Sequence, residues 1–172
     1  FTLTTTKHQH VAWRINFFKK EANDNRPSIN WHYDHVYPHS NPKILIFLNE
    51  QSKHLGGTDI CPAHISKFIT ENTGYIGRVW ERKLMSKLLA PYSTIGEPFG
   101  MNQSGEWTIS DKSYYEFTPK NAGDAIIFYP SQCLHRGRNP IAQQRHAISI
   151  SLTPLHYAID NIDNPKLTAI DL

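Results

Sequence analysis

The sequence predicts an all-β fold of the sandwich or barrel type, with a jelly roll as the leading candidate and with one or a few peripheral helices. Many short runs of β-forming residues are separated by glycine, proline, asparagine and aspartate turn signals along the 172-residue chain. A single stretch shows helical periodicity. A hydrophobic content of 39% with 8 Phe, 8 Tyr and 4 Trp excludes a disordered chain. The length fits one domain spanning residues 1–172.

Turn and loop signals separate the expected strands of the N-terminal half. These strands lie, in order, at residues 11–18, 29–37, 43–49 and 58–61. The polar run 19–27 forms a loop after the first of them. The unbroken apolar run in 43–49 predicts a strand buried on both faces. Gly56 and Gly57 mark a bend before the last strand.

The C-terminal half contains the only helix that periodicity indicates. Residues 78–90 place apolar side chains four apart, and Pro91 ends the pattern. The glycine-, serine- and aromatic-rich segment 91–118 reads as an irregular excursion. Strands follow at 125–129 and 145–152. The second strand alternates strictly, with a small, polar face around Arg145 and an isoleucine-rich face opposite.

Composition and charge exclude several classes of function. The formal net charge is only +3, without a block of like charges, so we do not expect nucleic-acid binding. The longest apolar run, 44–48, is far shorter than the roughly 20 residues of a membrane span. Cys61 and Cys133 are too few for a disulfide framework, which favours free thiols in a reducing cytoplasm. Because the chain begins at Phe1 without a leader, we expect a fragment that lacks some N-terminal structure.

Ten histidines in 172 residues direct attention to metal binding. His32 and Asp34 stand two apart, so on a strand both side chains point to one face and can reach a single ion. A third ligand must come from another strand, and His135, which follows the strand at 125–129 and opens a hairpin at 134–139, is the best candidate. Two histidines and one carboxylate form the facial triad of non-heme Fe(II) oxygenases, which leaves open coordination positions for chemistry.

Arg145 is the candidate partner for a carboxylate co-substrate. It follows His135 by 145 − 135 = 10 residues, on the far strand of the expected hairpin, with Ala147 and Ser149 as small neighbours on its face. The planar guanidinium fork matches a carboxylate.

The order of these motifs resembles the Fe(II)/2-oxoglutarate-dependent dioxygenase superfamily, most closely its phytanoyl-CoA dioxygenase-like branch. The motifs are His32-x-Asp34, KILIFLN, GGTDICPAH, NAGDAIIFYP, LHRG and Arg145, and the resemblance covers residues 30–152. It implies a double-stranded β-helix (a cupin-like jelly roll), iron held by His32, Asp34 and His135, and Arg145 on the distal carboxylate of 2-oxoglutarate. The implied reaction uses O2 and releases succinate and CO2 while an unactivated C–H bond of a small-molecule substrate is hydroxylated.

Two departures from that branch affect these expectations. Many members carry a serine where this chain has Gly137, so one usual hydrogen bond to 2-oxoglutarate must come from elsewhere. Members also carry N-terminal helices against the large sheet, and little precedes the first strand here. The second departure agrees with a chain that lacks N-terminal structure.

Further residues are candidates for co-substrate or substrate contacts. Asn16 on the first strand and Tyr33 beside the ligands could hydrogen-bond 2-oxoglutarate, although plain structural packing is the preferred explanation for both. For the substrate, the candidates are His64, Trp80, Trp107 and Arg136. Residues 65–118, which contain several aromatics, are expected to form an insertion or lid over the barrel mouth.

Alternative functions remain open at this point. A cupin-type metalloenzyme could use the same triad without 2-oxoglutarate, in which case Arg145 has no function there. A jelly-roll binding module with a degenerate site would not retain an intact triad. A halogenase is disfavoured because Asp34 occupies the position that chloride takes on the iron.

Overall fold

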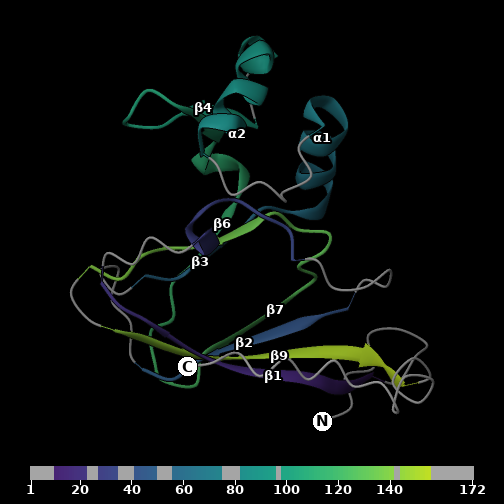
Figure 1. Cartoon of the computed structure of the whole chain (residues 1–172), viewed down its shortest axis with the longest axis vertical. Helices are drawn as coiled ribbons and strands as arrows, with labels where there is room; N and C mark the ends of the chain where they lie inside the picture. The colour runs from purple at the N-terminus through teal and green to yellow at the C-terminus, as the bar shows by residue number, and fades with distance from the viewer. Residues whose placement is uncertain are drawn as a thin grey trace.

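The fold is a pair of β-sheets capped on one side by a layer of helices (Figure 1). The computed structural model describes residues 10–22, 27–34, 41–49, 56–74, 82–95, 98–141 and 144–155. Between residues 115 and 154 consecutive strands alternate between these two sheets, as in a jelly roll, and residues 99–101 and 107–109 form a further, two-stranded sheet. The expectation of a mainly β fold of this type is confirmed.

The large sheet has four antiparallel strands in the order β1-β9-β2-β7. Their bounds are His10–Lys20 for β1, Arg145–Pro154 for β9, Lys43–Phe47 for β2 and Ala125–Phe128 for β7. Asn16 pairs with Ser149, and Ile15 pairs with Ile150. Ser149 is fully buried whereas Ile15 is exposed, so the polar face is the inner one and the isoleucine face is the outer one.

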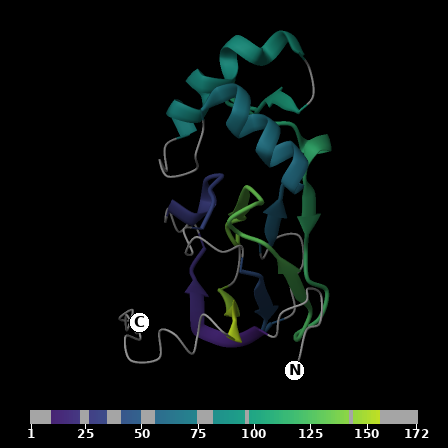
Figure 2. The ribbon, with the colours of Figure 1, turned by 90° about the vertical axis from the view of Figure 1, so that its right-hand side faces the viewer.

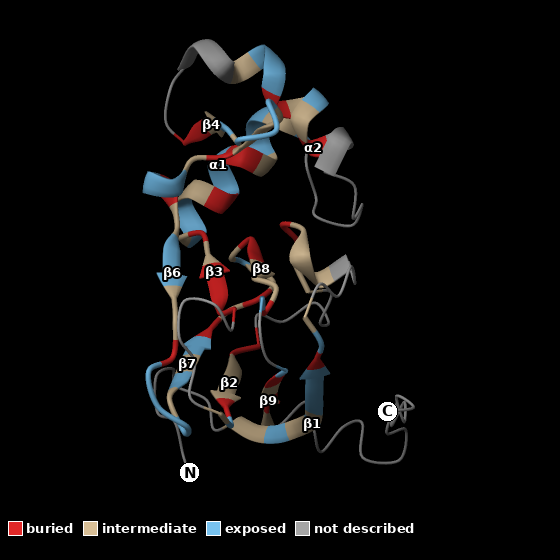
Figure 3. Cartoon of the chain, turned by 90° about the vertical axis from the view of Figure 1, so that its left-hand side faces the viewer, coloured by how far each residue is buried: buried red, intermediate tan, exposed pale blue. Residues whose placement is uncertain are grey.

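The small sheet has three short strands in the order β6-β3-β8, with bounds Tyr115–Phe117, Thr58–Ile60 and His135–Gly137. A single bridge between His32 and His135 adds a further chain segment at its edge. Figure 3 shows β3 mostly buried, β8 partly buried and β6 mostly exposed.

A helical layer covers the small sheet on the side away from the large sheet (Figure 2). Its elements are α1 (Ala63–Thr73), α2 (Arg82–Leu89), η3 (Ala90–Ile95), β4 (Phe99–Met101), β5 (Trp107–Ile109) and η4 (Asp111–Ser113). Ile69, Leu89 and Ile109 of this layer pack with Trp31 and Leu134 in one buried cluster. No helix among the described residues is long and apolar enough to cross a membrane.

The peripheral helices are confirmed, and among the described residues α1 stands beside the helix that periodicity indicated. Periodicity indicated 78–90, of which α2 covers 82–89 and residues 78–81 lie outside the described residues. The helix α1 was not predicted, because it contains β-branched residues and has no side-chain N-cap at Pro62. Ile65 and Ile69 at helical spacing, with Gly74 in the left-handed conformation (φ 68°) as the C-terminal cap, were the available signals.

Three further expectations about strands were wrong. Within 29–37, the described residues contain only the end of η1 (Pro27–Ile29) and the bridge at His32. In β2 only Phe47 is fully buried, because the outer face of the large sheet is not covered by the described residues. The expected hairpin partner of the 134–139 segment is also wrong: β8 pairs with β3 and β9 pairs with β1 and β2, so His135 and Arg145 lie in different sheets.

Candidate metal centre

The three predicted metal ligands meet between the two sheets. His32 and His135 exchange backbone hydrogen bonds of 3.0 Å in both directions, which fixes the two imidazoles side by side with ring centroids 4.2 Å apart. Asp34, two residues after His32, returns to the same side and its backbone N–H donates to the carbonyl of Pro130. One ligand atom from each of His32, Asp34 and His135 lies within 4.8 Å of the others.

The orientation of both imidazoles suits a divalent metal ion. Asn30 and Cys133, each two residues before a ligand histidine, offer backbone carbonyls to Nδ1 of His32 (2.7 Å) and Nδ1 of His135 (3.0 Å). A hydrogen on Nδ1 leaves the lone pair on Nε2, and both Nε2 atoms lie 3.5–3.6 Å from Oδ1 of Asp34. Two imidazoles and one carboxylate, turned toward a common point, are the donor set of a non-heme Fe(II) site.

The electrostatics of the triad favour the protonation states that bind metal. Burial would raise the pKa of the Asp34 carboxyl, but hydrogen bonding to His135 and His32 and the charge of Lys43 outweigh it, and the pKa lies well below its ordinary value. Burial lowers the pKa of the His135 imidazole, although Asp34 opposes the shift. At neutral pH the site therefore offers a carboxylate and a neutral imidazole.

Lys43 belongs to the site and was not predicted. It is the first residue of β2, and its ammonium forms an ion pair and hydrogen bond with Oδ2 of Asp34. The only sequence signal was a charged residue at the start of an apolar strand. In the structure Lys43 pairs with Ser151, whose side chain lies on the inner face of β9.

Arg145 lies on the inner face of the large sheet, as its small neighbours Ala147 and Ser149 suggested. It is 9% exposed, and its Nη1 donates to the carbonyl of Gly57 at 2.7 Å and of Arg138 at 3.5 Å. Its guanidinium carbon lies 6.0 Å from the centroid of the Phe47 ring. These contacts fix the guanidinium between the two sheets.

Gly137 makes room for Arg145. A Cβ at Gly137 would lie 3.0 Å from Nη2 and 3.4 Å from Nη1 of Arg145, which is a crowded contact. The absence of the usual serine at this position therefore has a steric reason in this chain.

The two other candidates for 2-oxoglutarate contacts differ in their placement. Asn16 is half-buried and shares the inner face with Ser149, and its Oδ1 accepts a 3.1 Å hydrogen bond from Nε of Arg14. The hydroxyl of Tyr33 instead donates to the carbonyl of Ser66 and lies 3.0 Å from Oγ1 of Thr70, both on α1. The structure thus does not bring the Tyr33 hydroxyl to the triad.

The candidate substrate residues are not all together. Trp107 and Arg136 line one cavity of about 620 Å³ between the helical layer and the small sheet. His64 is exposed on α1 and does not line it, and Trp80 lies outside the described residues. Trp31 and Arg136, the chain neighbours of His32 and His135, line this cavity, whereas none of the three ligand side chains does.

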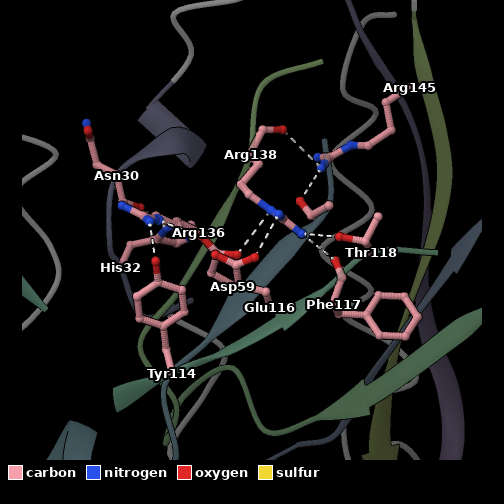
Figure 4. Close-up of polar contacts among 11 residues, drawn as sticks. Asn30, His32, Asp59, Tyr114, Glu116, Phe117, Thr118, Arg136, Arg138 and Arg145 are labelled. Atoms are coloured by element: carbon pink, nitrogen blue, oxygen red, sulfur yellow. Dashed lines mark hydrogen bonds and ion pairs between the residues drawn. The ribbon is translucent and has the colours of Figure 1, made fainter. Parts of the chain in front are cut away.

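A buried ion network supports the small sheet and was not predicted (Figure 4). Asp59 on β3 is 0% exposed and contacts Nε of Arg136 at 2.9 Å and Nε of Arg138 at 3.1 Å. Arg138 continues to Glu116 on β6 at 3.3 Å. Burial raises the pKa of the Asp59 carboxyl, although the two arginines lower it. The network joins all three strands of the sheet that carries His135.

Two aromatic rings pack against the guanidinium of Arg136. The guanidinium carbon of Arg136 lies 4.6 Å from the ring centroid of Trp31 and 5.3 Å from that of Tyr114. Its Nη2 also donates to the Tyr114 hydroxyl at 3.3 Å. Arg136 therefore belongs to the ion network and also lines the cavity with a guanidinium held in place by two rings.

No protein-family model matches this chain, and no curated protein sequence does either. Solved structures resemble it at low sequence identity. EvdMO1 shares 19% identity with a TM-score of 0.45, over 85% of this chain and 27% of EvdMO1. The apo non-heme monooxygenase ThoJ shares 12% with a TM-score of 0.49, over 84% of this chain and 46% of ThoJ. HygX from Streptomyces hygroscopicus, with nickel and 2-oxoglutarate bound, shares 15% with a TM-score of 0.37, over 86% of this chain and 54% of HygX. This chain thus spans roughly a quarter to a half of these proteins.

Proposed function

We propose that this chain is the catalytic core of an Fe(II)- and 2-oxoglutarate-dependent oxygenase that hydroxylates an unactivated C–H bond of a small molecule. The observation that carries the proposal is the buried His32, Asp34 and His135 cluster, whose imidazoles both turn Nε2 toward Oδ1 of Asp34. The order of motifs supports the phytanoyl-CoA dioxygenase-like branch. Free Cys61 and Cys133 agree with a reducing compartment such as the cytoplasm.

Each residue of the site has a defined task in this proposal. His32, Asp34 and His135 hold the iron, which when bound supplies the activation of O2 and the oxidative decarboxylation of 2-oxoglutarate. Arg145 binds the distal carboxylate of 2-oxoglutarate from the facing sheet and sets its orientation. Asn16 lies on the same inner face and is placed to contact the co-substrate. The carbonyls of Asn30 and Cys133 keep the two imidazoles oriented.

The substrate, in this proposal, uses the cavity that Trp107 and Arg136 line. Its wall includes Asn30, whose carbonyl orients His32, and Gly137, which adjoins the Arg145 guanidinium. The cavity therefore reaches the edge of the small sheet beside the inner site. β4, β5 and α2 supply much of the wall, which supports a lid role for the segment 65–118.

A cupin-type metalloenzyme that does not use 2-oxoglutarate is the second candidate. It needs the triad alone and no carboxylate-binding arginine. The inward position of Arg145 between the two sheets favours the 2-oxoglutarate enzyme, since a guanidinium there can bind a carboxylate and the cupin-type reaction needs none.

The experiment that tests the proposal is an anaerobic titration of the iron-loaded protein with 2-oxoglutarate. A weak visible charge-transfer band, characteristic of a 2-oxo acid chelated to Fe(II), is expected for the wild type. His32→Ala, His135→Ala and Asp34→Ala should lose iron and the band while circular dichroism shows an intact fold. Asp34→Ala opens no void in the apolar core, but it leaves the Lys43 ammonium without its carboxylate partner, so a moderate loss of stability is expected and is measured by urea unfolding.

Two outcomes contradict the proposal. Iron uptake that is unchanged in all three variants would show that these residues are not the ligands. Iron binding without a 2-oxoglutarate band would favour the cupin-type alternative.

Succinate release stimulated by members of a metabolite panel then identifies the substrate, and Trp107→Ala should weaken that stimulation.

A further inference from the structure

Lys43 occupies a position from which it acts on one metal ligand only. It begins β2 and pairs with Ser151 of β9 and Phe128 of β7, on the inner face of the large sheet. Its side chain is 17% exposed, and its ammonium contacts Oδ2 of Asp34. The ion pair therefore crosses from the large sheet to the segment that carries His32 and Asp34.

The two oxygens of Asp34 have different surroundings. Oδ1 lies 3.5 Å from Nε2 of His32 and 3.6 Å from Nε2 of His135, at the point where a metal ion would be shared. Oδ2 is turned to the Lys43 ammonium. The carboxylate thus offers one oxygen to the metal position and the other to a cation of the protein.

A carboxylate can bind a metal ion through one oxygen or through both. Binding through both oxygens would occupy a coordination position that a chelating co-substrate needs. A charge-assisted hydrogen bond to Oδ2 opposes that second mode, because the oxygen would have to leave the ammonium. The same ammonium also repels a divalent cation at the site.

We infer that Lys43 is a positioning residue that keeps Asp34 a one-oxygen ligand and that thereby lowers the affinity of the site for its metal. This inference rests on the proposed function, since it concerns the same three ligands. Its consequence is a site that binds iron less tightly but keeps its coordination positions open.

The test uses Co²⁺ alone as a probe, without turnover. Lys43→Met removes the charge at similar side-chain volume, and Lys43→Arg retains a cation. Lys67→Met makes the same chemical change on the exposed face of α1, where Lys67 pairs with Glu71 at 3.6 Å, and serves as the matched control. Affinity and the visible d–d spectrum of bound Co²⁺ are measured for each variant, and thermal unfolding followed by circular dichroism verifies the fold.

Lys43→Met should bind Co²⁺ about tenfold more tightly than the wild type, which corresponds to about 1.4 kcal/mol. Its d–d spectrum should change, since the coordination number of the ion rises when Asp34 contributes both oxygens. Lys43→Arg and Lys67→Met should resemble the wild type in both measurements. If Lys43→Met does not fold, the expected near-wild-type affinity and spectrum of Lys43→Arg still test the need for a cation.

Other results overturn the inference. Equal or weaker Co²⁺ binding by Lys43→Met, or an unchanged spectrum, would show that Lys43 neither restrains Asp34 nor repels the metal. So would a Lys43→Arg protein that binds and absorbs like Lys43→Met. A wild-type chain that takes up no Co²⁺ at the triad, judged against His135→Ala, overturns the proposed function as well, so the two failures are distinguishable.

Discussion

The two sheets differ in what covers their outer faces and in what holds their strands together. On the large sheet, Ile15, Phe17 and Ile127 are between 50% and 61% exposed. The small sheet is covered by the helical layer, whose Ile69 and Leu89 pack with Leu134 at 0% exposure. Within the described ranges, the outer face of the large sheet is thus left exposed, whereas the small sheet has the helical layer packed beside it.

The strands of the two sheets also differ in length. β1 and β9 have 11 and 10 residues, and a long backbone ladder with one irregularity between Ala12 and Arg14 joins them. Each strand of the small sheet has only three residues. Strands this short are marginal by backbone hydrogen bonding alone, and the Asp59 network and the helical layer compensate. The metal ligand His135 therefore depends on side chains that have no role at the metal itself.

The largest effect is expected from Asp59→Ala. The substitution leaves Arg136 and Arg138 without their buried counter-charge, which costs about 3 to 5 kcal/mol in unfolding free energy. Urea unfolding measures the change. Glu116→Gln, which breaks only the exposed end of the network, should cost less than about 1 kcal/mol. Equal small losses in both variants would show that the network does not hold the small sheet.

A paired substitution compares the two outer faces. Ile69→Ala opens a void in the helical layer at a fully buried position and should cost about 2 to 5 kcal/mol. Phe17→Ala on the exposed face of β1 should cost at most about 0.5 kcal/mol. Thermal and urea unfolding of both variants measure these changes in the free energy of unfolding. A large loss for Phe17→Ala would mean that the outer face of the large sheet is covered in solution.

Arg145→Ala separates the contributions of the two sheets to the site. A charge-assisted, two-pronged hydrogen bond in a partly dry pocket is worth about 3 kcal/mol, so the 2-oxoglutarate requirement should rise about a hundredfold. Iron binding should persist, because the ligands belong to the other side of the barrel. Lysine should restore only part of the loss, since a point charge cannot reproduce the planar fork. Superimposable titrations of succinate release for wild type, Arg145→Lys and Arg145→Ala would exclude this role.

Gly137→Ala should have a smaller effect on 2-oxoglutarate binding than Arg145→Ala. The added Cβ crowds the Arg145 guanidinium at 3.0 Å, and a shift of its side chain costs about 1 kcal/mol, or roughly a fivefold weaker 2-oxoglutarate binding. The same change made in Arg145→Lys should have less effect, because the guanidinium that it crowds is gone. Equal losses in both backgrounds would place the effect of Gly137 in the β8 backbone.

The sequence by itself determined the class of fold and the identity of the strongest site residues. Alternation along 145–152 located β9 and its polar face, because a period of two is a local property of the chain. His32 and Asp34 are two apart, so their common orientation was also readable locally. His135 and Arg145 followed from motif order, although their placement in different sheets did not.

Only the tertiary structure decided which distant side chains complete the site. Lys43 reaches Asp34, and Asp59 reaches Arg136 and Arg138 across 77 residues or more, through contacts that no local pattern encodes. The Tyr33 hydroxyl donates to a carbonyl of α1, a helix that periodicity had not indicated. These outcomes depend on which elements pack together, and packing is set by the whole chain, whereas strand alternation is set by neighbouring residues.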